Sequence, residues 1–119
     1  MEIHNLNIPM KPLSVNEAWK GQRFKTDRYK AYEKEMLLRL PLGTLPDPPY
    51  YVYYEFGFSN SLCDFDNPCK PLGDILQKKY GFNDKDIYEA HICKKLVKKG
   101  REYIKVQIEH MSTFKPKES

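Results

Sequence analysis

The hydrophobic positions of the chain recur at two spacings, and each spacing predicts its own kind of element. Apolar residues at every second position predict short strands at residues 4–8 and 104–108. The segment YYVYYEFGF, residues 50–58, is a stronger strand candidate, because aromatic and β-branched side chains favour a pleated, half-buried surface. One face of it carries Tyr50, Val52, Tyr54, Phe56 and Phe58. Residues 87–94 have the composition of a further strand.

Apolar residues three and four positions apart predict two amphipathic helices. The first runs from Asp27, near its start, to Leu40, and Pro41 ends it. The second is marked by Leu72, Ile75, Leu76 and Tyr80. We expect Gly81 to cap its end, and Asn67 to be its N-cap with Pro68 in the first turn.

These elements, joined in order, predict an α+β fold. Residues 12–27 are expected to form an irregular loop, and the proline-rich residues 41–49 are too short to be an interdomain linker. The last two strands are expected to pair as a hairpin through KKLVKKGR, residues 94–101. The order β-α-β-α-β-β predicts a single domain, residues 1–111, with one mixed sheet and two main helices packed on it. The basic tail, residues 112–119, is expected to be disordered.

The composition suits one soluble domain. The chain has 119 residues, of which 40% are hydrophobic and 30% are charged. No stretch approaches the roughly 20 apolar residues that span a bilayer, and the N-terminus lacks the apolar run of a signal peptide. We therefore expect a cytoplasmic protein without a membrane partner.

The cysteines do not predict a disulfide framework. Cys63, Cys69 and Cys93 are odd in number and show no CxxC spacing. A zinc site made from them and His91 has no recognised spacing, so free thiols are the preferred interpretation.

Charge is distributed unevenly along the chain, whose net charge is +4. Basic residues concentrate in residues 20–30 and 94–105, whereas the chain between Leu40 and Cys69 contains no lysine or arginine. Two basic segments that flank an acidic one suit a polyanion held against a site that needs carboxylates. The alternative is that each basic run is only a solvated face.

The acidic segment, SLCDFDNPCKPLGDIL, holds the candidate chemistry. In extended backbone Asp64 and Asp66 share a face, and two close carboxylates favour a divalent cation between them. Oxygen ligands favour Mg²⁺, Mn²⁺ or Ca²⁺ over zinc, and Asp84 could supply a third carboxylate where the chain turns back into the sheet. Alternatively, DxDN before a helix is ordinary turn and capping chemistry, and Asp74 is only a solvated helix position.

A cation next to such a site favours phosphate chemistry. Lys70 would lie at the N-terminus of the second helix, where unpaired amides already favour anions. The metal would polarise the phosphoryl oxygen of a phosphodiester and activate water, while Lys70 would stabilise the developing charge. Lys70 could equally be a plain surface lysine.

The ordered series of these residues resembles the RusA-type Holliday junction resolvases, from about residue 8 to residue 110. The resemblance is carried by Asp64-Phe65-Asp66-Asn67, Lys70, Asp74-Ile75-Leu76, Gly81-Phe82-Asn83-Asp84 and Lys94, and upstream by Pro12-Leu13-Ser14-Val15-Asn16, Trp19, Tyr29 and Tyr32. The family commonly has two adjacent aspartates at the late site. Here Asn83-Asp84 is followed by Asp86, so Asp84 acts alone or shares the role with Asp86.

The resemblance implies a Mg²⁺-dependent endonuclease, with Mn²⁺ as a substitute ion, that resolves four-way DNA junctions by paired symmetric nicks. It implies a homodimer, often encoded by phages or prophages, that acts in DNA recombination and repair. Asp64, Asp66 and Asp84 take the places of the metal-binding aspartates and Lys70 that of the catalytic lysine, with Asn67, Asp74 and Asp86 as possible supporting residues. The cations expected to contact DNA are Lys20, Arg23, Lys25, Lys98, Lys99 and Arg101.

Two other functions remain open from the sequence. A nuclease of the same fold could act on flaps, forks or other branched DNA with the same residues. A non-catalytic DNA-binding protein could use its aspartates only to cap a helix.

Overall fold

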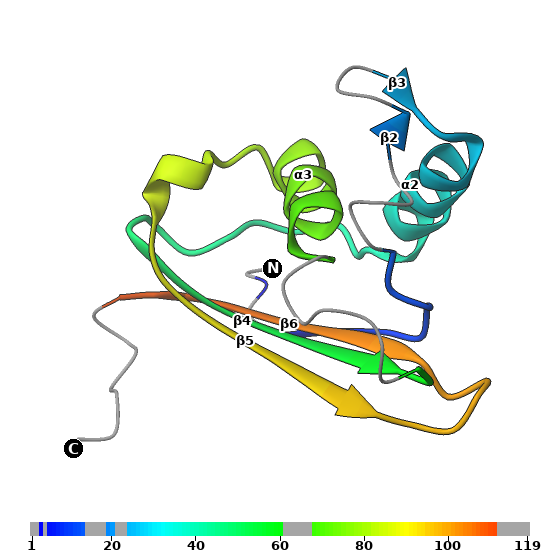
Figure 1. Ribbon diagram of the computed structural model, residues 1–119. Helices are drawn as coiled ribbons and strands as arrows, with labels where there is room; N and C mark the ends of the chain where they lie inside the picture. The colour runs from blue at the N-terminus through cyan, green and yellow to red at the C-terminus, as the bar shows by residue number, and fades with distance from the viewer. Residues whose placement is uncertain (1–2, 4, 14–18, 21–23, 61–67, 112–119) are drawn as a thin grey trace.

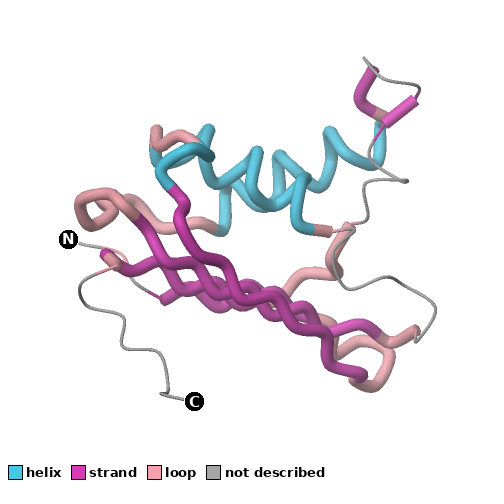
Figure 2. Tube along the Cα trace, turned by 60° about the vertical axis from the view of Figure 1, so that its left-hand side comes forward, coloured by secondary structure: helices cyan, strands magenta, loops and turns pink. Residues whose placement is uncertain are grey.

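Two helices lie on one face of a four-stranded sheet in the computed structural model, which describes residues 3, 5–13, 19–20, 24–60 and 68–111 (Figures 1 and 2). Its elements are β1 (Asn5–Ile8), β2 (Trp19–Lys20), β3 (Phe24–Lys25), α2 (Asp27–Arg39), β4 (Tyr50–Phe58), α3 (Cys69–Tyr80), the 3₁₀ turn η1 (Asp84–Asp86), β5 (Ile87–Leu96) and β6 (Tyr103–His110). The predicted α+β class with a mixed sheet is confirmed. Neither helix within these ranges is long and apolar enough to cross a membrane.

The strand order is β1-β6-β4-β5, with β4 and β5 parallel and the other pairs antiparallel. The predicted strand β4 is confirmed and has a neighbour on each side. Every residue of β4 except Tyr53 is buried, because the helices cover one face of it and long side chains of the flanking strands cover much of the other. A strand buried on both faces is suited to the interior of a sheet.

The predicted hairpin between the last two strands is wrong. Strands β5 and β6 do not pair with each other, because β4 lies between them: Phe56 of β4 is level with Lys94 on one side and with Ile104 on the other. The connection instead crosses the end of β4, where the amide of Val97 donates to the carbonyl of Phe58 at 2.8 Å. Burial of the aromatic strand outweighs the short connection that favoured a hairpin.

Both helices form where the apolar spacing predicts them. The Thr26 hydroxyl caps α2 by accepting a hydrogen bond from the amide of Tyr29 at 3.1 Å. Gly81 ends α3 in the left-handed conformation, with φ 73°, as predicted. The expected N-cap Asn67 is wrong, since Pro68 occupies that position and makes no side-chain capping bond. A fixed φ suits proline to a helix start, where its missing N–H leaves no bond unmade.

The segment predicted as an irregular loop, residues 12–27, contains a small antiparallel pair. Strands β2 and β3, of two residues each, are joined by the register Trp19↔Lys25 and Lys20↔Phe24. Elements this short have no hydrophobic period that a sequence could show.

The core lies between the helices and the sheet. Its completely buried side chains come from both layers: Met36 of α2, Phe56 of β4, Leu72, Ile75 and Leu76 of α3, and Ile104 of β6. Because α3 connects the parallel strands β4 and β5, it runs back across the sheet and carries its polar side along these two strands.

Candidate functional site

A groove lies between α3 and the strands β4 and β5, and it is the candidate site. Its volume is about 380 Å³. The polar residues that line it are Lys70, Asp74, Gln77 and Asp84, and its floor includes Val52, Tyr54, Ala90 and Ile92. Three of the residues selected from the sequence, Lys70, Asp74 and Asp84, are therefore brought to one surface.

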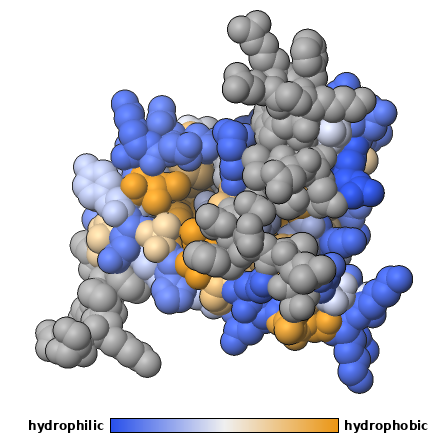
Figure 3. All heavy atoms as spheres, viewed as in Figure 1, coloured by the Kyte–Doolittle hydropathy of each residue, from blue (hydrophilic) through white to orange (hydrophobic). Residues whose placement is uncertain are grey.

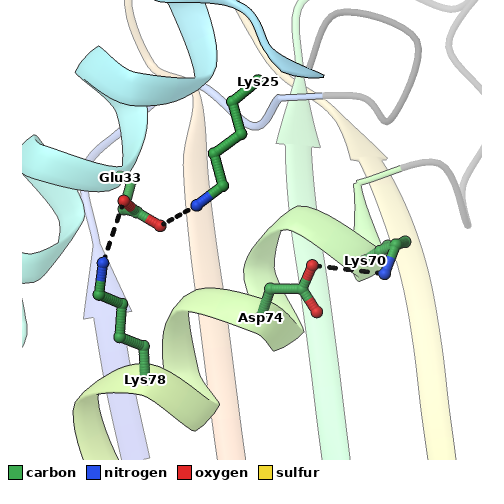
Figure 4. A network of polar contacts seen from close by, with 5 residues as sticks. All are labelled: Lys25, Glu33, Lys70, Asp74 and Lys78. Atoms are coloured by element: carbon green, nitrogen blue, oxygen red, sulfur yellow. Dashed lines mark hydrogen bonds and ion pairs between the residues drawn. The ribbon is translucent and has the colours of Figure 1, made fainter. Parts of the chain in front are cut away.

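Lys70 and Asp74 form an ion pair along one side of α3. The Lys70 Nζ lies 3.4 Å from the Asp74 Oδ2, and the spacing of four residues puts both side chains on the same helix face (Figure 4). The Lys70 side chain is 62% exposed and that of Asp74 is 34% exposed. An exposed pair of this kind contributes little to stability, so both groups can bind a ligand at low cost.

Asp84 reaches the groove from the turn that follows α3. The turn is held by Asn83, whose side-chain Oδ1 accepts from the Lys85 amide at 3.1 Å and whose carbonyl accepts from the Asp86 amide at 2.9 Å. The pKa of the groove residue Tyr54 is raised, first by burial and then by the charges of Cys69 and Asp84. The Asp84 carboxylate is therefore close enough to the groove floor for its charge to act on the Tyr54 hydroxyl.

Asp86, the alternative to Asp84, is not among the residues that line the groove. It is half-buried, and its charge adds to the effect of burial in raising the pKa of Tyr50, at the start of β4. Of the two late aspartates, Asp84 is the one placed with Lys70.

The other predicted site residues, Asp64, Asp66 and Asn67, lie outside the described residues. Within the described ranges no three His, Cys, Asp or Glu side chains come close enough together to hold a metal ion. Asp84 supplies a carboxylate to the groove beside the Lys70–Asp74 pair, and hard oxygen ligands are the kind that Mg²⁺ takes together with substrate phosphates. The donors present therefore fit a Mg²⁺ site that further oxygen ligands would complete.

The cysteine and histidine grouping does not form in the part of the chain that the structure describes. Cys69 lies on the helix side of the sheet, near Tyr54, whereas Cys93 and His91 contact Tyr53 on the opposite face. Among the residues described, neither Cys69 nor Cys93 forms a disulfide bond.

Sequence reasoning missed Glu33 of α2, whose carboxylate forms ion pairs with lysines of β3 and α3. Its carboxylate oxygens lie 3.3 Å from the Lys25 Nζ of β3 and 3.4 Å from the Lys78 Nζ of α3 (Figure 4). Lys25 also lies over the ring of Tyr29, at 5.0 Å. The pKa of Tyr29 is raised to about 12 by burial and by the charges of Asp74 and Glu33. An isolated Glu in an amphipathic helix gives no sequence signal for this role.

The cations selected for DNA contact have different surroundings. Lys98, Lys99 and Arg101 are exposed on the turn between β5 and β6, where Figure 3 shows long hydrophilic side chains projecting at the lower right. Lys25 is partly buried and engaged by Glu33. Lys20 belongs to β2, although its side chain is not described, and Arg23 lies outside the described residues.

The groove therefore joins a cation and two carboxylates from α3 and the η1 turn, over a floor of apolar and tyrosine side chains. Such a combination can hold a divalent ion and a phosphate side by side. No protein-family model matches this chain, and no curated protein matches it.

Proposed function

We propose that the chain is a Mg²⁺-dependent, structure-specific DNA endonuclease that resolves four-way junctions by paired nicks. In this proposal it works as a homodimer in recombination and repair, in the cytoplasm of a bacterial or phage-infected cell. The observation that carries the proposal is the groove, in which Lys70, Asp74 and Asp84 lie together. The order of residues shared with the RusA-type resolvases supports the choice of substrate.

Each groove residue has a separate task. Asp84, together with Asp64 and Asp66, would hold the ion, which would supply Lewis acidity toward the phosphate and an acidified water. Lys70 neutralises the charge that develops on the phosphoryl oxygens. Asp74 acts through Lys70 as a positioning residue, because their ion pair limits where the ammonium can lie.

The phosphates outside the groove would be bound by exposed cations. The turn with Lys98, Lys99 and Arg101 projects beyond the end of the sheet, so it can reach a duplex arm that leaves the groove. Neutralising one of these residues should lower the salt dependence of junction binding by about 0.9 per lost phosphate contact. An unchanged slope would show that the turn is only solvated.

The test is cleavage of a synthetic four-way junction with Mg²⁺, with Mn²⁺ and with EDTA. We expect paired symmetric nicks that need the ion and that are lost in Asp66→Asn and Asp84→Asn. The matched control is Asp86→Asn, which removes a neighbouring charge that does not line the groove and should keep cleavage.

Three outcomes would change the proposal. Junction binding without cleavage under any divalent ion would indicate a non-catalytic DNA-binding protein. Equal cleavage of flaps, forks and junctions would indicate a broader branched-DNA nuclease. Equal loss of cleavage in Asp84→Asn and Asp86→Asn would contradict the assignment of the late ligand to Asp84 alone.

A further inference from the structure

The sheet has a second face, opposite α2 and α3, that we call the open face. In the part of the chain that the structure describes, both helices lie on the other side of the sheet (Figure 2). Strand alternation and register bring the open-face residues into four rows across the strands. The rows are Glu89, Tyr51 and Glu109; His91, Tyr53, Gln107 and Asn5; Cys93, Glu55, Lys105 and Asn7; and Lys95, Gly57 and Tyr103.

At the centre of the open face, Glu55 is only 9% exposed although α2 and α3 lie on the other side of the sheet. Its carboxylate accepts hydrogen bonds from the hydroxyls of Tyr53, at 2.6 Å, and of Tyr103, and lies 3.9 Å from the Lys105 Nζ. Cys93 completes the group, with its Sγ 3.1 Å from the Tyr53 hydroxyl. Neighbouring side chains therefore bury this carboxylate and satisfy it.

This arrangement changes what the open face presents to its surroundings. Because both tyrosine hydroxyls turn toward Glu55, ring surfaces rather than hydroxyls are left outward. Tyr53 stacks on His91, with ring centroids 5.4 Å apart, and Lys105 lies over the ring of Tyr103. The face is hollowed on its β1 side, where Asn5, Asn7 and Gln107 help to line a cavity of about 260 Å³. A tyrosine-rich surface without a free central charge is typical of protein interfaces.

The two ends of the open face carry opposite charge. Glu89 and Glu109 flank Tyr51 at one end, and Lys95 lies at the other end, six residues along β5. Lys98, Lys99 and Arg101 follow directly beyond the Lys95 end. In the rows between them, Glu55 and Lys105 neutralise each other. The face is therefore acidic at one end and basic at the other.

We propose that the open face binds a second copy of this chain, with the two sheets stacked back to back and their strands antiparallel. A two-fold axis across the strands puts the acidic end of each copy on the basic end of the other. Strand β5 then lies over β5, so that Glu89 of one copy faces Lys95 of the second, and the contact occurs twice. A two-fold axis along the strands would instead bring the acidic ends together, which like-charge repulsion disfavours.

The size of the face is sufficient for a modest dimer. Strands about 4.8 Å apart and about 26 Å long, with β1 only half as long, give a flat area of about 450 Å² for each copy. Side chains roughen the surface, so the accessible area of the pair exceeds twice this value and approaches the lower end of stable interfaces, about 1,200 Å². An interface of this size suits a reversible dimer.

The choice of a second copy also rests on the proposed function, because two symmetric nicks need two equivalent sites. The candidate groove lies over β4 and β5 on the helix side. With β5 stacked on β5, both grooves lie at the same edge of the double sheet, one on each outer side. A branched DNA at that edge could contact both.

The experiment is sedimentation equilibrium of the full chain without DNA, at several protein concentrations and at low and high salt. We expect a reversible dimer that weakens with salt. Lys95→Glu and Glu89→Lys should each weaken it by about tenfold, because each reversal creates two like-charge contacts. The double variant, Glu89→Lys with Lys95→Glu, should restore it.

The control is Lys34→Glu on α2, which makes the same change of charge on an exposed residue of the helix side and should leave the dimer unchanged. A chain that sediments as a monomer throughout, or a dimer insensitive to both reversals, would overturn the proposal. Failure of the double variant to recover would do the same if its far-ultraviolet circular dichroism matches the wild type. A dimer that forms without junction cleavage would leave this interface standing and remove the proposed function instead.

Discussion

The candidate groove and the open face each contain an acidic residue next to a lysine, but in opposite states. In the groove, the Lys70 and Asp74 side chains are 62% and 34% exposed and pair only with each other among the contacts described above. On the open face, Glu55 is 9% exposed and already accepts two tyrosine hydrogen bonds. Similar residue types thus supply an available charged pair in one place and a satisfied, structural one in the other. The difference predicts that the first region governs activity and the second governs stability.

The largest expected effect is a loss of cleavage on removing the charge of Lys70, which the same change at Lys105 should not produce. Lys70→Met keeps the aliphatic stem but removes the charge, and should lower junction cleavage by about 100-fold or more at nearly unchanged stability. Lys105→Met makes the same change beside Glu55 and should lower the free energy of unfolding with little effect on the cleavage rate per dimer. Single-turnover cleavage and urea unfolding measure the two quantities. Equal losses of cleavage in both variants would contradict the separation.

Removal of the buried carboxylate should affect stability more than loss of the exposed ion pair in the groove. Glu55→Ala leaves the hydroxyls of Tyr53 and Tyr103 and the Lys105 ammonium without their shared acceptor, and should lower the free energy of unfolding by about 2–3 kcal/mol. Asp74→Ala breaks only the exposed pair with Lys70 and should cost about 0.5 kcal/mol. Urea titration of both variants measures the difference, and similar values would show that the open-face network is not structural.

Two glycines test the same comparison through packing. A Cβ at Gly57 would overlap the ring of Tyr103, so Gly57→Ala must displace that ring from Glu55 and should cost about 1–3 kcal/mol. A Cβ at Gly73, in the groove helix, meets nothing within 4 Å. Gly73→Ala should therefore stabilise α3, by about 0.5–1 kcal/mol. Thermal unfolding should shift the two variants in opposite directions, and a shared direction would argue against this packing.

The smallest expected effect is a dependence of stability on acid. Desolvation alone would raise the pKa of Glu55, but hydrogen bonds from Tyr103 and Tyr53 and the charges of Lys105 and Lys95 outweigh it and lower that pKa. A lowered pKa means that Glu55 stabilises the fold above the ordinary glutamate value of about 4.3 and that this contribution is lost as the pH falls through the folded-state pKa. Between neutral pH and pH about 3, the wild type should lose more stability than Glu55→Gln, and parallel curves would refute the mechanism.

The two helices, the central strand and the grouping of Lys70, Asp74 and Asp84 are predictable from the sequence because their signals are local. Spacing along the chain places Leu72 and Leu76 on one face of α3, and the same spacing places Lys70 beside Asp74 on another. The turn that brings Asp84 to the groove follows directly from the Gly81 cap.

The remaining features depend on neighbours far apart in the chain. Nothing local shows that β4 lies between β5 and β6, since that order follows from the burial of both faces of the aromatic strand. The role of Glu55 depends on Tyr103, forty-eight positions away. The sequence does contain one signal for this role, a single carboxylate inside an aromatic strand, because a buried charge needs hydrogen-bond or ion-pair partners. The role of Asp64 and Asp66 stays a prediction.

The position of β6 between β1 and β4 also constrains how the chain can fold. Asn5 pairs with Gln107, so β1 cannot join the sheet until almost all of the described chain is present. Because β4 lies between β5 and β6, these two strands form no local hairpin that could nucleate folding at this end of the sheet. A topology dominated by such distant contacts folds slowly, and during synthesis the aromatic strand β4 would wait with one edge unpaired. A nascent chain stalled before residue 103 should therefore need chaperones to protect the unpaired edge of β4. A chain whose β6 has already emerged from the ribosome should not need them.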